Sequence, residues 1–256
     1  MLPKVSIITV VRNNQDGLQK TLENLTGLDY PAVELVVVDG ASTDGTLGVV
    51  EKFADRMAYW VSEPDNGLYD AMNKGILAAT GDYLWFVNAG DTVLRTDCLS
   101  EIFSDKGDCA AREKYADIYF GETVVADPDG NILGLRKKKL PARLSPASLR
   151  KGLVVCHQSF IVRRMIAPLY DTSLRYVSDI DWVIRCLQNA KSVVNANMVL
   201  SCFETGGIST RHRKEGLRER WKVMRRYYGL LATLIAHMGF CLDSLKPDYR
   251  KFNSDL

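Results

Sequence analysis

Residues 62–91 read SEPDNGLYDAMNKGILAATGDYLWFVNAGD, and this stretch decides the fold. The apolar spacing over 67–79 predicts a helix, and the run over 83–87 predicts a strand that ends at Asn88-Ala89-Gly90-Asp91. An acidic turn at the carboxyl end of a strand is where an open α/β sheet binds its ligand. Because carboxylate oxygens suit a hard cation, the stretch predicts a Mg²⁺ or Mn²⁺ site that holds a diphosphate.

The residues before this stretch alternate strand and helix. The β-branched runs over 5–11 and 33–38 are typical of strands buried on both faces, and 57–61 predicts a shorter strand. Helical spacing over 16–25 and a helix capped by Asp44 separate them. This order predicts a mostly parallel sheet with crossover helices in the first third of the chain.

The pattern changes after Leu94. We expect a short helix over 98–103, a β-hairpin formed by 117–126 and 131–137, and a strand over 154–162. A helix over 178–187, a strand over 193–203 and a long helix from 214 to about 245 follow. The long helix is basic at first and then apolar.

Length, charge and composition limit the classes of function that fit this chain. A chain of 256 residues fits one α/β domain with a C-terminal appendage, and its net charge of +2 gives no support for nucleic-acid binding. No run of about 18 apolar residues exists to span a membrane, and the first residues do not resemble a signal peptide. We therefore expect a cytoplasmic, reducing setting, in which the cysteines are buried thiols.

Polar residues at the ends of the predicted parallel strands are the first candidates for a site. Thr9 and Asp39 end the first two strands, and Asn88 and Asp91 follow the fourth. Asp39 predicts a hydrogen-bond acceptor for a nucleoside, although an Asx-turn before Gly40 explains it equally well in isolation. A cation at Asp91 can position a diphosphate and stabilise it as it departs.

Two helices carry further candidates. Asp70 and Asn73 share a face of the helix over 67–79, where a solvated face is the competing explanation. Asp179 and Asp181 lie in Ser178-Asp179-Ile180-Asp181-Trp182, either as acids that favour a helix N-terminus or with one of them as a general base. Since they are two residues apart, at most one is expected to face the site.

Two other segments leave alternatives open. His157-Gln158 follows an apolar run, and its histidine is either structural or functional. The segment from Gly206 to Arg213 is either a lid over a diphosphate or a surface loop.

Taken together, these motifs resemble glycosyltransferase family 2, whose members have the GT-A fold. The matching pieces span about residues 4–210 in the family's order, and they are SIITVVRNN, VVVDGASTDGT, SEPDNGLYDAMNKGILAATGDYLWFVNAGD, HQSF, SDIDW and GGIS. NAGD is the form found among bacterial surface-polysaccharide enzymes of the colanic-acid and O-antigen type. The resemblance implies an α/β fold with a Rossmann-like mixed sheet flanked by helices, to which the helical spacing after residue 210 adds a C-terminal appendage.

The resemblance also implies an activity, an inverting glycosyl transfer. The donor is a nucleotide-diphosphate sugar, a UDP-sugar by family frequency, and the acceptor is a hydroxyl of a glycan or a lipid-linked molecule. It implies a catalytic domain over 1–210, with a nucleotide-binding half over 1–94 and an acceptor half over 95–210, followed by an extension over 211–256.

Site roles follow residue by residue from the resemblance. Thr9, Val11 and Asp39 bind the nucleoside part of the donor, and Asp70 and Asn73 line its pocket. Asp91 binds Mn²⁺ or Mg²⁺, with Asn88 standing where many relatives have an acid. Asp179 is the base, with Ser178 in place of the family's Glu, and Asp181 is the second choice.

Two other classes remain open. A nucleotide-sugar binding protein without transferase activity is kept open by Asn88 and Ser178. A sugar nucleotidyltransferase is disfavoured, because such enzymes carry a glycine-rich, basic loop after the first strand. The segment at that place here, Val11-Arg12-Asn13-Asn14-Gln15-Asp16-Gly17, contains one glycine.

The basic and apolar C-terminal helix lies outside the resemblance. It is expected either to pack on the catalytic domain or on a second subunit as a homodimer, or to bring the enzyme to the inner face of the plasma membrane as a peripheral protein.

Overall fold

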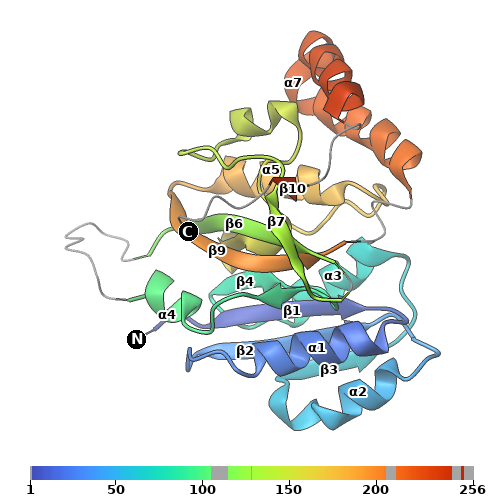
Figure 1. The fold of residues 1–256 in the computed structure, drawn as a ribbon, viewed down its shortest axis with the longest axis vertical. Coiled ribbons are helices and arrows are strands. Elements are labelled where there is room, and N and C mark those ends of the chain that lie inside the picture. The colour runs from blue at the N-terminus through green and yellow to red at the C-terminus, as the bar shows by residue number, and fades with distance from the viewer. Residues whose placement is uncertain (1, 105–114, 128, 206–211, 244–248, 251–256) are drawn as a thin grey trace.

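The computed structural model describes residues 2–104, 115–127, 129–205, 212–243 and 249–250 (Figure 1). Its first part consists of alternating strands and helices that match the predicted order. They are β1 (Val5–Val11), α1 (Gln15–Leu25), β2 (Val33–Asp39), α2 (Thr46–Lys52), the 3₁₀ turn η1 (Ala54–Arg56), β3 (Tyr59–Ser62), α3 (Leu68–Ala78) and β4 (Tyr83–Phe86).

The second part is richer in antiparallel strands and ends in the longest helix. Its elements are β5 (Thr92–Val93), α4 (Cys98–Ile102), β6 (Ile118–Ala126), β7 (Ile132–Arg136), η2 (Pro146–Lys151), η3 (His157–Ser159), β8 (Phe160–Arg163), η4 (Arg164–Ile166), α5 (Ser178–Asn189), β9 (Val193–Glu204), α7 (Arg213–Asp243) and β10 (Tyr249–Arg250).

One mixed sheet joins the two parts in the strand order β10-β7-β6-β8-β4-β1-β2-β3. Strands β1 to β4 pair in parallel, as predicted, whereas β8 pairs antiparallel with both β4 and β6. β6 and β7 form the predicted hairpin, and β10 adds to its outer edge. The short strand β10, which follows α7 in the chain, is therefore part of the sheet.

Both faces of the sheet are covered, which explains why β1 is buried along its whole length and shows no apolar–polar alternation. Ile8 and Val10 belong to the core under α3 and α5, whereas Ile7 and Val11 belong to the core under α1, α2 and α4. Successive side chains of a strand point to opposite faces, so a strand buried on both sides has no polar alternation.

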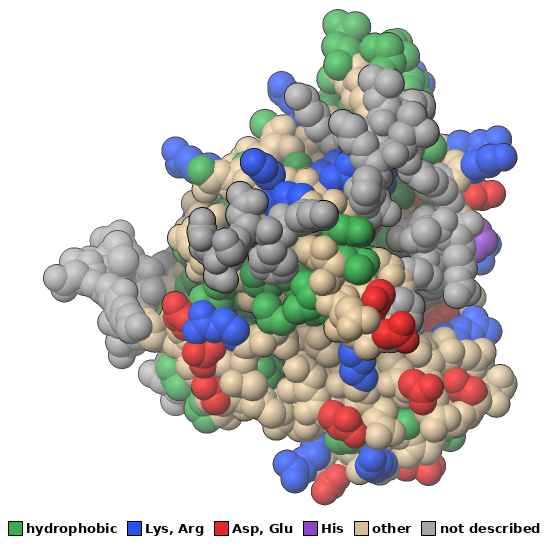
Figure 2. Space-filling view, viewed as in Figure 1, with side chains coloured by type: hydrophobic (Ala, Val, Ile, Leu, Met, Phe, Trp, Pro, Cys, Tyr) green, Lys and Arg blue, Asp and Glu red, His purple; other side chains and the backbone are tan. Residues whose placement is uncertain are grey.

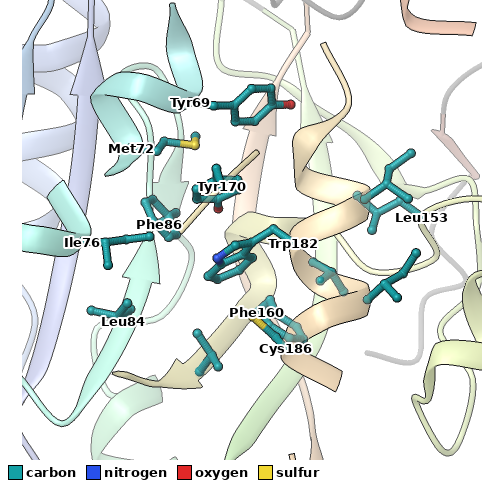
Figure 3. Packing of buried hydrophobic residues seen from close by; sticks show 14 of the residues in the cluster. Tyr69, Met72, Ile76, Leu84, Phe86, Leu153, Phe160, Tyr170, Trp182 and Cys186 are labelled. Atoms are coloured by element: carbon teal, nitrogen blue, oxygen red, sulfur yellow. The ribbon is translucent and has the colours of Figure 1, made fainter. Parts of the chain in front are cut away.

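An aromatic column fills the core between α3, α5 and the sheet (Figure 3). The rings of Tyr69 and Tyr170 stack at a centroid distance of 5.3 Å, and Tyr170 stacks on Trp182 at 4.8 Å. Phe86 of β4 meets Trp182 edge-on at 5.5 Å. Replacing a fully buried ring of this kind by Ala typically costs about 3–5 kcal/mol, so this column fixes α5 against the sheet.

One predicted element was wrong in part. The strand expected over 154–162 is limited to β8, because His157–Ser159 forms the 3₁₀ turn η3. An apolar run cannot distinguish a buried strand from other buried segments by its periodicity. The turn has a consequence for the site, since it places His157 and Gln158 beside the end of β4.

Candidate active site

The carboxyl ends of the parallel strands meet at one edge of the sheet. Val11 of β1 is in register with Asp39 of β2, which is in register with Ser62 of β3. The chain leaving β4 stays beside β1, because Ala89 N donates to Val10 O at 3.4 Å. The structure therefore brings the predicted strand-end residues to one edge.

Asp39 is buried at this edge and is held by serine donors. Its Oδ2 accepts from Ser42 N at 3.0 Å and from Ser62 Oγ at 2.6 Å, and its Oδ1 accepts from Ser42 Oγ. An ionised carboxylate has about four acceptor positions, so one remains for a ligand donor. A Cβ at Gly40 would lie 2.1 Å from Asp65 Oδ2, so a larger residue there would have to displace the Asp65 side chain.

Thr9 and Val11 lie at the carboxyl end of β1, on this edge of the sheet. Thr9 is 1% exposed, and its hydroxyl donates to Val87 O at 2.8 Å. Val11 is 6% exposed, and its carbonyl accepts from Gly40 N at 2.9 Å. The hydroxyl proton of Thr9 is thus used within the sheet and is not available to donate to a ligand.

The side chains of Asp70 and Asn73 are used for local structure. Asp70 Oδ2 accepts from Asn66 N at 3.0 Å, which closes the entry to α3. Asn73 accepts from Tyr170 N at 2.7 Å and donates to Tyr170 O at 3.0 Å. This pair of bonds fixes the amide of Asn73 against Tyr170 and uses one of its two N–H groups, while Asp70 is half-buried.

The turn after β4 is shaped by Gly90 and Thr21. Gly90 has a φ of 102°, a conformation that favours glycine, and its N donates to Thr21 Oγ1 at 3.0 Å. Thr21 Oγ1 in turn donates to Asp91 O at 2.7 Å. These bonds explain why Asn-Ala-Gly-Asp turns back toward α1 and buries its last residue.

Asp91 is 5% exposed and accepts two hydrogen bonds. Gln158 Nε2 donates to its Oδ2 at 2.8 Å, and Glu204 N donates to its Oδ1 at 3.3 Å. Burial raises the pKa of Asp91 to about 6 and outweighs these hydrogen bonds, which act in the opposite direction. A buried carboxylate of this kind gains from a cation that compensates its charge.

Gln158 was not predicted as a site residue, although HQSF was among the matching pieces. It is 2% exposed, and its Oε1 accepts from the thiol of Cys156 at 2.7 Å. Its carbonyl accepts from Trp85 Nε1 at 2.8 Å. The fixed amide therefore presents a donor to Asp91, and only the non-strand geometry of η3 makes this contact possible.

Asn88 connects this turn with His157. Asn88 Nδ2 lies 3.2 Å from His157 Nε2, while Asn88 Oδ1 is buried without a hydrogen-bond partner. Since an amide nitrogen only donates, His157 accepts at Nε2 and carries its proton on Nδ1. An orphaned buried oxygen is an acceptor that a ligand can satisfy.

The residues present fit a divalent cation shared with a diphosphate. Asp91 offers a carboxylate and Asn88 an unpartnered amide oxygen, and Mg²⁺ is usually bound through one or two carboxylates plus substrate phosphates. No cluster of three or more His, Cys, Asp or Glu side chains able to hold a metal exists within the described part of the chain. The fit therefore needs phosphate oxygens to complete the coordination.

Asp179 lies beyond His157 at the start of α5. Its Oδ2 is 3.9 Å from His157 Nδ1, and its Oδ1 accepts from Tyr69 OH at 3.4 Å and from Ile180 N at 2.9 Å. The carboxyl is 21% exposed. Burial raises the pKa of Tyr69 well above its ordinary value, so its phenol remains a donor to this carboxylate.

Asp181 has a different environment. It is 1% exposed and accepts from Arg185 Nε at 2.7 Å, from Tyr227 OH at 2.8 Å and from Arg226 Nη1 at 3.4 Å. Ser178, which precedes both acids, is buried and donates to Asp171 O at 2.9 Å. As the spacing predicted, only one of the two aspartates faces the edge, and it is Asp179.

The predicted loop over Gly206–Ser209, together with Arg211, lies outside the described residues. His212 stacks on Tyr176 at a ring distance of 4.8 Å.

The sequence of this chain is similar to those of known glycosyltransferases. The model of "Glycosyl transferase family 2" matches residues 6–167. An uncharacterized glycosyltransferase of Mycobacterium tuberculosis is 34% identical over 241 residues, which cover 88% of this chain and 86% of the relative. A PGL/p-HBAD biosynthesis glycosyltransferase of the same species is 29% identical over 219 residues, which cover 81% of this chain and 79% of the relative.

Solved structures share the fold at lower identity. S. aureus TarS 1-349 in complex with UDP-GlcNAc has a TM-score of 0.68 at 18% identity and covers 95% of this chain and 76% of its own. The mannosyltransferase PcManGT from Pyrobaculum calidifontis, in complex with GDP-Man and Mn²⁺, has a TM-score of 0.60 at 15% identity and covers 96% of this chain and 76% of its own. The architecture is thus that of the GT-A fold, and with the family match and the 34% identical relative, the chain belongs to glycosyl transferase family 2 as a glycosyltransferase.

Proposed function

We propose that this glycosyltransferase moves a sugar from a nucleotide-diphosphate donor to an acceptor hydroxyl with inversion of configuration. A UDP-sugar is the first donor to test, since TarS binds UDP-GlcNAc on the same fold, and the acceptor is a glycan or a lipid-linked molecule. The observation that carries the proposal is the continuous arrangement of Asp91, Asn88, His157 and Asp179 along the sheet edge.

The donor lies along this edge in the proposal. Asp39 accepts from the nucleoside, and Asp91 and Asn88 Oδ1 hold a divalent cation together with the diphosphate. PcManGT, which was solved with Mn²⁺, makes manganese the first metal to test. The bound cation supplies charge neutralisation for the departing diphosphate.

Asp179 is the general base in this account. It takes the proton of the acceptor hydroxyl as that oxygen bonds to the anomeric carbon, while the bond from the anomeric carbon to the diphosphate oxygen breaks. The diphosphate leaves with the electron pair of that bond, and a single displacement inverts the anomeric centre. Tyr69 OH donates to Asp179 Oδ1 at 3.4 Å and helps to hold the base in place, while His157 Nδ1 lies 3.9 Å from Asp179 Oδ2, beyond hydrogen-bond distance.

A binding protein without transferase activity is the second candidate. It is favoured by Asn88, which replaces an acid at the metal turn, and by Ser178, whose hydroxyl is already used on Asp171 O. The experiment that separates the two measures transfer and donor binding in Asp179→Asn. Lost transfer with retained binding supports the transferase, whereas a wild-type chain that binds donor but transfers to no acceptor and hydrolyses none supports the binder.

A further inference from the structure

The second half of α7 exposes an apolar face that nothing in the described structure covers. Gly229, with a φ of 78°, bends the helix, and the segment beyond it projects at the end of the molecule opposite α2 and β3 (Figure 1). Figure 2 shows hydrophobic side chains gathered at this end. We call them the α7 tip; they are Leu230, Leu231, Leu234, Ile235 and Met238, exposed by 53%, 73%, 43%, 57% and 62%.

The opposite side of this helical segment is already packed. Thr233 is buried, and its hydroxyl donates to Gly229 O at 2.6 Å. Ala236 is buried as well, and His237 meets Trp221 edge-on at 5.0 Å. The segment is thus anchored by one face while the other remains in solvent, which is the arrangement of an interfacial helix rather than of a core helix.

Cations lie next to the helix that carries the α7 tip. Between Gly130 and Tyr170 the chain has nine Lys or Arg residues and no Asp or Glu, and η2 within this stretch packs against α7. Arg150 is exposed and close enough to lower the pKa of Tyr228, which burial raises to about 12. The Lys138 and Arg220 head groups lie 4.9 Å and 5.0 Å from the ring of Phe240.

The sequence separates these charges from the apolar face. Residues 227–242 contain no Asp, Glu, Lys or Arg, whereas residues 213–226 contain seven Lys or Arg and two Glu. Lys222 and Arg225 of this basic half are exposed. An uncharged apolar segment next to a cationic one is the pattern that inserts among acyl chains while its neighbours bind anionic head groups.

An anionic bilayer explains both the exposed apolar face and the cations near it, whereas a second copy of the chain explains only the apolar face. A two-fold interface brings the same surface of both subunits together, so the cations around one α7 tip would face those around the other. An anionic bilayer accepts the apolar side chains and neutralises the cations. No helix in the described segments is long and apolar enough to cross a membrane, which leaves attachment at the surface.

We propose that the α7 tip, with the nearby cations Lys138, Arg150, Lys222 and Arg225, is a docking surface for an anionic phospholipid bilayer. This attachment does not depend on the transfer reaction. It does have a consequence for orientation, because Tyr227, two residues before the bend, bonds to Asp181 on the helix that carries Asp179. A docked α7 holds that helix at a fixed distance from the membrane surface.

Co-sedimentation of the full chain with vesicles tests the proposal. The probes are vesicles of phosphatidylcholine alone and of phosphatidylcholine mixed with phosphatidylglycerol, each at low and high salt. The variant is Leu231→Asp with Ile235→Asp, and the matched control is Leu77→Asp, since Leu77 on α3 is also 73% exposed. Unchanged nucleotide-induced thermal shifts in each variant show that folding is intact.

The wild-type chain and Leu77→Asp are expected to sediment with the anionic vesicles at low salt, less so at high salt, and poorly with neutral vesicles. The double variant is expected to lose about tenfold or more of this partitioning. A wild-type chain that stays in the supernatant with anionic vesicles at low salt overturns the proposal, as does a double variant that binds like the wild type. Light scattering that shows a dimer converted to a monomer by the double variant, without vesicle binding by the wild type, assigns the face to a second copy instead.

Discussion

Asp179 and Asp181 both begin α5, but their carboxyl groups have different partners. Asp179 Oδ2 lies 3.9 Å from His157 Nδ1 at the strand edge, whereas Asp181 accepts from Arg185, Arg226 and Tyr227. One helical turn thus contributes a candidate base to the site and a buried ion-pair centre to the contact between α5 and α7. The two residues form a matched pair for separating chemistry from stability.

Replacing Asp179 by Asn is expected to lower kcat for glycosyl transfer by about 10²–10⁴, the usual contribution of a general base. Its thermal midpoint and its affinity for the donor are expected to stay near those of the wild type, because the carboxyl is partly exposed. Replacing Asp181 by Asn is expected to do the reverse and to destabilise the fold by about 1–3 kcal/mol, because Arg185 and Tyr227 lose a buried, charged hydrogen-bond acceptor. Steady-state kinetics and thermal melts of both variants check this, and equal loss of kcat in the two would contradict the assignment of the base.

Gln158 is expected to act on the metal through Asp91. Replacing it by Ala removes the donor to Asp91 Oδ2 and leaves that carboxylate free to turn, which in comparable sites weakens metal affinity about 10–100-fold. The readout is the Mn²⁺ concentration needed for half of the donor-induced thermal shift. The control is Gln19→Ala, at a partly exposed position on α1 where the amide bonds to Glu23. The same Mn²⁺ requirement in Gln158→Ala and the wild type would show that Gln158 is structural.

Glu34 gives a stability prediction that depends on pH. Burial alone would raise its pKa, but hydrogen bonds from Lys4, Ser6 and Thr80 lower it to about 2. Since the folded-state pKa lies below the unfolded value of 4.5, the charged form stabilises the fold above pH 4.5, and this contribution is lost as pH falls toward 2. Replacing Glu34 by Gln is expected to cost about 2–3 kcal/mol at neutral pH and much less near pH 2–3.

Urea unfolding of Glu34→Gln and the wild type across this pH range measures the difference. Glu51→Gln, at an exposed position on α2, is the control. A stability difference between Glu34→Gln and the wild type that does not change with pH would mean that the interactions of Glu34 do not depend on its charge.

Much of the fold could be predicted from local patterns. The apolar run over 5–11 coincides with β1, and the spacing over 67–79 lies within one residue of α3 at each end, because periodicity and strand burial are local properties. The strand over 154–162 failed because the bonds that turn residues 157–159 away from the sheet come from distant residues, Trp85 and Asp91.

The site was predictable at the level of the strand ends but not of single contacts. Asp39, Asp91 and Asp179 were identified by position or resemblance, and the structure places each of them at the edge. The roles of Thr9 and Asn73 could not be refined from sequence, since their partners Val87 and Tyr170 are distant in the chain. Gln158 was missed for the same reason, because its only signal was its place within HQSF.

The central claim is that Asp91 holds a divalent cation on which donor binding depends. The most direct measurement is the thermal shift produced by nucleotide diphosphates and their sugar conjugates, with and without Mn²⁺, in the wild type, Asp91→Asn and the exposed control Asp55→Asn. The account predicts a Mn²⁺-dependent rise in the melting midpoint with one class of nucleotide in the wild type and in Asp55→Asn, and none in Asp91→Asn. A shift that is the same without metal, or that survives in Asp91→Asn, would contradict the claim.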